Sequence, residues 1–162
     1  MITTEQLTKA KIIVADDQKL HALFLKDVLG QDGFVNIACV NDPLRVLPTV
    51  LDFQPDLLVL DLIMPQLDGF QIMSQLADFR KDNYLPILAL PSDKNSDIRL
   101  KALQGGATDI LNKPYETVEI LFRIRNMIEM RILHMAVKDQ NLALEDRVRE
   151  RTKELRETQL DI

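Results

Sequence analysis

Residues 58–70 read LVLDLIMPQLDGF, and this stretch opens with an apolar run that stops at one acidic residue, Asp61. A short apolar run of this kind is typical of a strand that is buried on both faces of a parallel sheet. Asp61 would then lie at the carboxyl end of that strand. In open α/β sheets the ligand crevice lies at this edge, so Asp61 is the first candidate for a functional residue.

A second apolar run, IIVA at 12–15, is followed directly by Asp16 and Asp17. The carboxyl ends of parallel strands meet at one edge of a sheet. We therefore expect Asp16, Asp17 and Asp61 to gather in one acidic pocket, with the ammonium of Lys113 above it.

Three carboxylates at such close range repel one another, and they either take up protons or hold a small hard cation. Mg²⁺ suits this donor set, because it prefers oxygen ligands in an octahedron and keeps several waters. Asp61 can then attack a phosphoryl group as a carboxylate nucleophile, while the metal and Lys113 neutralise charge on the transferred oxygens. The product of that reaction is an acyl phosphate.

The remainder of the chain alternates between apolar runs and helical patterns. We expect five strands at about 11–14, 36–40, 56–60, 86–90 and 109–111, with helices at about 18–31, from 42, 69–79, 96–104 and from 116. This alternation predicts an α/β fold, a doubly wound five-stranded parallel sheet covered on both faces. The expected strand order is the flavodoxin-like 2-1-3-4-5.

Two of these helices carry particular signals. The helix at 18–31 has apolar residues and one acid at helical spacing, namely Leu20, Leu23, Phe24, Asp27 and Val28. The next helix begins with Asp42 as N-cap and Pro43 at the first helical position. Pro48 falls inside that helix and should kink or shorten it.

Length and composition fit one compact domain with an appendage. We expect an N-terminal tail at 1–10, the domain at 11–130 and an extended helix at 131–162. A net charge of −5 argues against direct nucleic-acid binding. The single cysteine, Cys39, lies in a predicted strand, and we interpret it as a thiol of the protein core. No membrane span or signal segment is evident, so we expect a cytoplasmic protein.

The last predicted helix is unusually long, because no Pro or Gly occurs between Glu116 and the final residue. About 46 residues could form one helix. A heptad frame places Met127, His134, Asn141, Val148, Leu155 and Ile162 at a positions, and Met130, Val137, Leu144, Arg151 and Thr158 at d positions. Asn141 at an a position favours a parallel two-stranded register, so this helix predicts a parallel homodimer. The other interpretation is a solvated helical linker.

Three stretches resemble one known family, the receiver domains of two-component response regulators. They are VADDQ at 14–18, LVLDLIMPQLDGF at 58–70 and GATDILNKP at 106–114. The resemblance covers about residues 11–130. It implies that Asp61 accepts a phosphoryl group from a histidine kinase or phosphotransfer protein, and that Lys113 contacts that group. It also implies a cis Lys113–Pro114 bond and an Mg²⁺ site made by Asp16, Asp17, Asp61 and the backbone carbonyl of Ile63.

Two residues depart from the pattern of that family. The position that usually carries a Thr or Ser after the fourth strand is Pro91, which has neither a hydroxyl nor a backbone N–H. Ser92 follows and could supply the hydroxyl in its place. The usual Tyr or Phe three residues before Lys113 is Ile110. Either phosphorylation is transmitted by another route, or the chain is a phosphorylation-independent pseudo-receiver that acts as an interaction and dimerisation module.

The run NLALEDRVRERTKELRETQ at 141–159 resembles the signalling helix that joins receivers to output modules, notably in HD-GYP-type cyclic di-GMP phosphodiesterase regulators. This resemblance implies either a fragment whose output domain would follow, or a short regulator whose output is dimerisation. We find no motif of an output enzyme. The chain is therefore expected to catalyse only its own phosphorylation.

Overall fold

The fold is seen in a computed structural model, which describes residues 2–92 and 94–160. It divides into two compact units, Met1–Arg131 and Ile132–Ile162. The first unit holds a five-stranded sheet with strands β1 (Lys11–Ala15), β2 (Asn36–Val40), β3 (Leu57–Asp61), β4 (Ile87–Leu90) and β5 (Asp109–Ile110). All the strand pairs are parallel and the order is β2-β1-β3-β4-β5, which confirms the predicted fold class.

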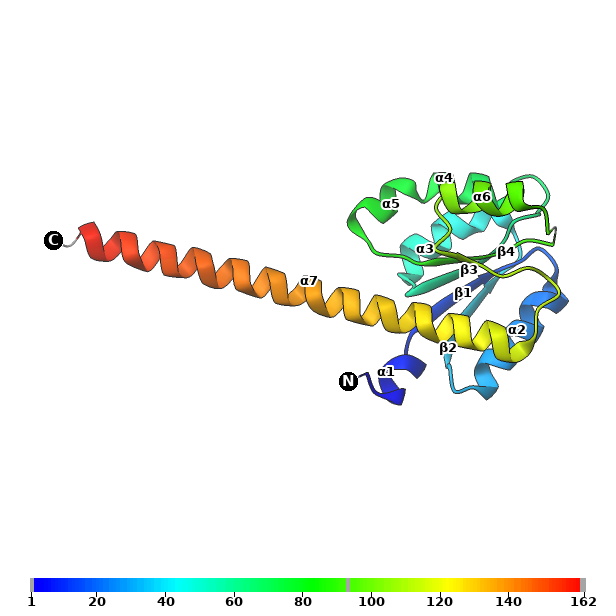
Figure 1. Cartoon of the computed structure of the whole chain (residues 1–162), viewed down its shortest axis with the longest axis horizontal. Coiled ribbons are helices and arrows are strands. Elements are labelled where there is room, and N and C mark those ends of the chain that lie inside the picture. Colours follow the sequence, from blue (N-terminus) through cyan, green and yellow to red (C-terminus); the bar gives the residue numbers. More distant parts are fainter. Residues whose placement is uncertain (1, 93, 161–162) are drawn as a thin grey trace. The chain divides into compact units, whose positions relative to one another are not determined.

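Helices cover both faces of this sheet (Figure 1). They are α2 (Lys19–Gln31), α3 (Val46–Phe53), α4 (Gly69–Gln75), α5 (Ala77–Asp82), α6 (Ser96–Gln104) and the long α7 (Thr117–Leu160). The helices α3, α4, α5 and α6 lie on one face, and α2 lies on the other together with the first turns of α7.

The core follows from alternation along the strands, since successive side chains of a strand point to opposite faces. Ile13, Leu58 and Leu60 belong to one buried cluster with side chains of α3, α4 and α6. Their neighbours Ile12 and Val59 are buried as well and face the α2 side. β3 is buried along its whole length, which explains its continuous apolar sequence.

Some predicted boundaries differ from the structure, each for a local reason. The helix expected from residue 42 is divided into a 3-10 turn, η1 (Pro43–Arg45), and α3. Pro48 therefore lies in the first turn of α3, where its missing N–H leaves no bond unmade. This confirms that Pro48 shortens the helix. The segment expected as one helix at 69–79 is also divided, into α4 and α5 around Leu76.

The structure differs from the sequence pattern at two further places. The inward face of α2 consists of Ala22, Leu25 and Leu29, whereas Leu20, Leu23 and Phe24 are exposed. At the start of the chain, where no element was predicted, residues 4–8 form a short helix, α1 (Thr4–Thr8), with Thr3 as the N-cap of a capping box.

The first turns of α7 are held against the domain by three arginines. Arg125 bonds both carboxylate oxygens of Asp32 at 2.7 Å, and Arg123 lies 2.8 Å from Asp109. Arg131 donates to Asp56 at 2.7 Å and also to the carbonyl of Tyr84. The described part of the chain contains no helix that is long and apolar enough to cross a membrane.

We expect Arg131→Gln to lower the free energy of unfolding by roughly 2 kcal/mol, because hydrogen bonds to a shielded charged group are lost. The Arg131 side chain is 15% exposed and that of Asp56 is 32% exposed. Chemical denaturation measures this change. The control is Arg149→Gln, whose ion pair with Glu145 is solvent-exposed and should change stability by less than about 0.5 kcal/mol. Equal effects of both substitutions would contradict the anchoring role of Arg131.

Candidate functional site

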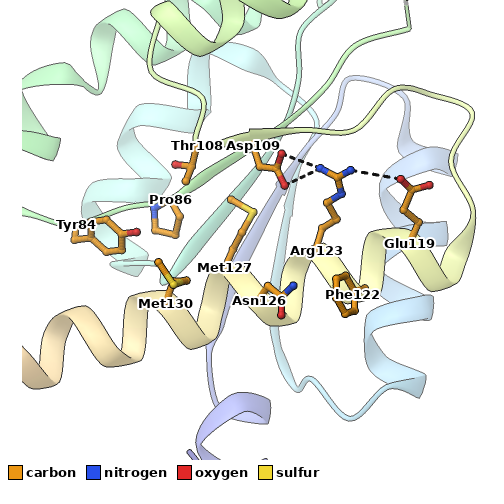
Figure 2. Close-up of a pocket in the computed structure, with 10 residues that line it drawn as sticks. All are labelled: Tyr84, Pro86, Thr108, Asp109, Glu119, Phe122, Arg123, Asn126, Met127 and Met130. Carbon is orange, nitrogen blue, oxygen red and sulfur yellow. Dashed lines mark hydrogen bonds and ion pairs between the residues drawn. The ribbon is translucent and has the colours of Figure 1, made fainter.

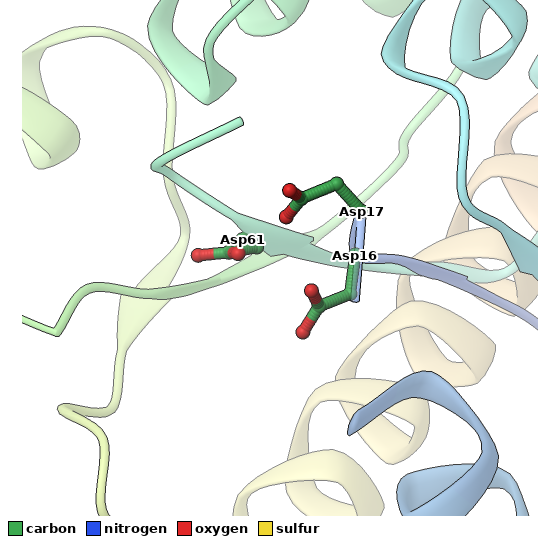
Figure 3. Close-up of side chains that lie close together, drawn as sticks. All are labelled: Asp16, Asp17 and Asp61. Carbon is green, nitrogen blue, oxygen red and sulfur yellow. The ribbon is translucent and has the colours of Figure 1, made fainter. Parts of the chain in front are cut away.

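The sheet brings the three predicted carboxylates together (Figure 3). Ala15 at the end of β1 pairs with Leu60 of β3, so Asp16 and Asp61 follow at the same edge. Oxygens of Asp16, Asp17 and Asp61 all lie within 4.8 Å of one another. Asp16 and Asp61 are buried, and Asp17 is half-buried. The donor set consists of oxygen only, as Mg²⁺ requires.

Asp16 has hydrogen-bonding partners at both carboxylate oxygens. Its Oδ1 accepts from the backbone N–H of Gln18 at 3.0 Å, and its Oδ2 accepts from Lys113 Nζ at 2.9 Å. His21 Nδ1 lies 3.7 Å from the same Oδ2, and the His21 side chain is half exposed. The ammonium of Lys113 is therefore closer to Asp16, at 2.9 Å, than to Asp61, at 3.7 Å.

The surroundings of Asp61 raise the pKa of its carboxyl group. Burial raises its pKa to about 6, the ammonium of Lys113 opposes this rise, and the charge of Asp16 adds to it. Lys113 Nζ lies 3.7 Å from Asp61 Oδ2, and the N–H of Ile63 donates to Asp61 Oδ1 at 3.3 Å. A single ammonium does not compensate three carboxylates, so the pocket fits a divalent cation.

Lys113 is aimed by the loop that follows β5. Its backbone N–H donates to the carbonyl of Pro91 at 2.8 Å, which extends the β4–β5 pairing past the end of the strands. The Lys113–Pro114 bond is cis, as the sequence resemblance implied. The side chain of Lys113 is only 16% exposed.

Gly69 lets the chain after β3 turn back closely. A Cβ at this position would lie 2.8 Å from the carbonyl oxygen of Asp61 and from Leu62 Cα, so no larger residue fits without displacing backbone. The N–H of Gly69 donates to Leu62 at 3.0 Å. Asp68 and Gln71 form a capping box that fixes the start of α4 beside Asp61.

The positions that depart from the family pattern have distinct surroundings. Pro91 is buried, and Ile110 is 2% exposed and belongs to the core cluster. Ser92 is exposed and lines a surface pocket of about 490 Å³ together with His21, Phe24, Lys113, Pro114 and Tyr115. The side chain of Ile63 is 64% exposed. Ser92 therefore shares a pocket with Lys113.

Sequence reasoning missed two residues of this region. Tyr115 lines the Lys113 pocket, and burial raises the pKa of its phenol. Asn41 follows β2 and donates from Nδ2 to the backbone carbonyl of Asp16 at 2.9 Å. The available signal for Asn41 was its place after the strand that neighbours β1 in the predicted order.

A second pocket of about 490 Å³ lies away from the carboxylates, between the starts of β4 and β5 and the first turns of α7 (Figure 2). Arg123 crosses its rim between Asp109, at 2.8 Å, and Glu119, at 3.5 Å. Phe122, Met127 and Met130 line it. Because its charged groups are already paired, this pocket has the character of a packing surface rather than a reaction site.

Residues 12–125 match the family model of the response regulator receiver domain. The chain belongs to this family. Response regulator MprA of Mycobacterium leprae (strain TN) is 36% identical over 118 residues, which cover 73% of this chain and 50% of that protein. Response regulator MprA of Mycobacterium tuberculosis (strain ATCC 25618 / H37Rv) is 32% identical over 145 residues, which cover 86% of this chain and 62% of that protein. The chain thus spans about half to three fifths of the length of these relatives.

Solved structures give the same family and fold. The receiver domain of the Francisella response regulator 1452 superposes with a TM-score of 0.69 at 25% identity, covering 75% of this chain and 98% of that chain. The receiver domain of a LuxO repressor protein from Vibrio parahaemolyticus gives 0.73 at 18% identity, covering 80% and 97%, and supports the fold alone. The family match ends at residue 125, so it does not cover the run at 141–159, whose resemblance to an HD-GYP signalling helix stays a prediction.

The raised pKa of Asp61 predicts a pH dependence of stability in the metal-free protein. Between the ordinary carboxyl pKa of 3.8 and the folded value of about 6, the folded state binds the proton more tightly, so Asp61 lowers stability as pH rises through this interval. Between pH 4 and pH 7, the free energy of unfolding of the wild-type receiver should fall by on the order of 2 kcal/mol relative to that of Asp61→Asn.

Chemical denaturation in the presence of a chelator, at several pH values, measures this difference. The control is Asp52→Asn, which removes an exposed carboxylate and should leave the wild-type pH profile unchanged. If wild type and Asp61→Asn show parallel profiles, Asp61 is not the group whose pKa is raised.

Proposed function

We propose that this receiver is a phosphorylatable switch, in which Asp61 accepts a phosphoryl group from a histidine kinase or phosphotransfer protein. The observation that carries this proposal is the position of Asp61. It is a buried carboxylate within 4.8 Å of two other carboxylates and 3.7 Å from the ammonium of Lys113. An oxygen of Asp61 attacks phosphorus, an O–P bond forms, and the P–N bond of the donor phosphohistidine breaks. Its electron pair stays with the leaving imidazole.

The roles of the surrounding residues follow from their chemistry. Asp16, Asp17, Asp61 and the carbonyl of Ile63 would hold Mg²⁺, which supplies charge neutralisation at the phosphoryl oxygens. Lys113 moves from its pairing with Asp16 to a phosphoryl oxygen, a change of partner over a short distance. Ser92 is proposed to donate the hydroxyl that Pro91 lacks, since it lines the same pocket as Lys113.

The receiver has an apolar surface on α2 that could bind the donor protein. Leu20, Leu23 and Phe24 are exposed on α2, by 80%, 55% and 54% respectively. Phe24 also lines the pocket that contains Lys113. Exposed apolar groups gathered beside a reactive site are typical of a protein interface, and they support a protein donor.

Asp61→Asn should abolish phosphorylation by a small-molecule donor, because the amide that replaces the carboxylate is a much weaker nucleophile. Intact mass after incubation with acetyl phosphate and Mg²⁺ measures this directly, with one added phosphoryl group expected on the wild type. Asp52→Asn, which removes an exposed carboxylate, is the control and should label as the wild type does.

Two results would contradict this assignment in different ways. Labelling of Asp61→Asn at the wild-type level places the phosphoryl group elsewhere. An unlabelled wild type, with acetyl phosphate and with a phosphorylated histidine domain, supports the pseudo-receiver alternative. The replacement of the usual switch pair by Pro91 and Ile110 favours that second candidate function.

Signal output is proposed to run through α7 and a parallel homodimer. The Lys113 loop leads directly into α7, so a change at the pocket has a short covalent path to this helix. In the second unit, Val137, Leu144, Val148 and Leu155 are each more than half exposed. Met127 does not join this seam, since it is 6% exposed in the receiver unit, and Ile162 lies outside the described residues. The predicted resemblance of the run at 141–159 to HD-GYP signalling helices favours a further output domain as the recipient of the signal.

Leu144→Asp should weaken the dimer by tenfold or more, because it places a charge at a d position on both helices. Sedimentation velocity of the whole chain at tens of micromolar, with and without beryllofluoride, measures the association. Leu142→Asp is the matched control, since it adds the same charge at a half-exposed position off the seam, and it should leave the dimer intact. Equal loss in both variants, or a monomeric wild type, would contradict the proposed seam.

A further inference from the structure

Asn41 is the residue immediately after β2, and its side chain reaches the backbone of the acidic pair. Its Nδ2 donates to the carbonyl oxygen of Asp16 at 2.9 Å. The backbone N–H of Asp16 in turn donates to the carbonyl of Val40 at 3.1 Å. Both backbone polar groups of Asp16 are therefore held by the end of β2.

The bond from Asn41 acts on a particular peptide group. The carbonyl of Asp16 belongs to the planar unit that joins Asp16 to Asp17. Holding its oxygen fixes the rotation of that plane, and this rotation sets the direction in which both side chains leave the backbone. Asp16 is also held at its carboxylate, by the N–H of Gln18 and by Lys113. The bond from Asn41 is thus one of the restraints that aim Asp17 at the pocket.

The choice of residue suits this role. An amide supplies an N–H donor without adding charge, whereas a lysine or arginine would compete with a cation for the carboxylates. An aspartate would place a fourth negative charge against a carbonyl oxygen. Asn41 is half-buried, so its hydrogen bond is partly shielded from water.

We propose that Asn41 is a positioning residue for the divalent-cation site of this receiver, acting through the Asp16–Asp17 peptide group. The inference rests on the proposed function, because it takes Asp16 and Asp17 as the cation ligands. Groups that hold metal ligands in place typically change metal affinity by ten- to a hundredfold when removed. A backbone hydrogen bond acts less directly than a bond to the ligand atom, so we expect the lower end of that range.

The chain supplies a matched control at the other end of the same strand. Asn36 opens β2, and its Nδ2 donates to the carbonyl of Lys9 at 2.8 Å. Lys9 precedes β1 as Asp16 follows it, so the two asparagines make the same type of bond at opposite ends of the β1–β2 pair. Both are half-buried. Only Asn41 lies at the edge that carries the carboxylates.

The test compares Mn²⁺ binding by Asn41→Ala and Asn36→Ala in the whole chain. The electron paramagnetic resonance signal of free Mn²⁺ measures how much of the ion stays unbound. Asn41→Ala should raise the dissociation constant for Mn²⁺ about tenfold. In Asn36→Ala this constant should stay within about twofold of the wild-type value. Both variants should increase the unfolding equilibrium constant in chelator by a similar factor, about fivefold for one lost hydrogen bond. Asn41→Ser, which retains a shorter donor, should bind Mn²⁺ with intermediate affinity and keeps the comparison available if Asn41→Ala is poorly folded.

A second readout separates positioning from general damage. In labelling by acetyl phosphate, Asn41→Ala should raise the Mg²⁺ concentration for half-maximal rate by the same factor, and leave the rate at saturating Mg²⁺ close to that of the wild type. Wild-type affinity for Mn²⁺ in both Asn41 variants would overturn the role of Asn41 and leave the proposed function standing. A wild type that binds no Mn²⁺ would overturn the cation site itself, and the inference with it.

Discussion

The site depends on one ammonium held among three carboxylates. Lys113 lies closest to Asp16, and its distance to Asp61 is longer by less than 1 Å, 3.7 Å against 2.9 Å. Because a single positive charge cannot neutralise three negative ones in a poorly solvated pocket, some of the electrostatic cost of gathering them is uncompensated. That residual cost is visible in the raised pKa of Asp61. A cation and a phosphoryl group would each find a pocket that the fold has already assembled.

The parallel sheet makes this concentration of charge possible. The carboxylates lie at the carboxyl ends of two apolar, buried strands, with Asp61 as the last residue of β3 and Asp16 and Asp17 directly after β1. The strands contribute stability, and the residues at their ends contribute charge. Gly69 and the capping box formed by Asp68 and Gln71 return the chain close to β3, so the loop after Asp61 is held tightly. On the opposite face, three arginines of α7 pair with Asp32 at the end of α2, Asp56 just before β3 and Asp109 in β5, and these pairs hold the first turns of α7. The acidic pocket and the first turns of α7 thus belong to the same compact unit.

Much of this arrangement could be predicted from the sequence, because it depends on local patterns. The apolar runs predicted the strands, and their alternation with helices predicted a parallel sheet and its strand order. Since Asp16, Asp17 and Asp61 directly follow or end such runs, they were expected at one edge of the sheet. The inward face of α2 was harder to identify, since small Ala22 points inward while the larger Leu20 and Phe24 stay outside. Burial there is decided by tertiary contact rather than by side-chain size. Asn41 was missed for a related reason, because its bond to Asp16 joins two strand ends through space and leaves no periodic trace in the sequence.

The chain contains no tryptophan and only two tyrosines, and these are divided between the two pockets described above. Tyr115 lines the pocket of Lys113, and Tyr84 lines the one beneath β4 and β5. Intrinsic tyrosine emission of this receiver therefore arises from one fluorophore near the acidic pocket and one near the first turns of α7. With Tyr84 replaced by Phe, Tyr115 becomes a native optical reporter of the acidic pocket, free of any attached dye. With Tyr115 replaced instead, the same spectrometer observes the place where α7 is anchored.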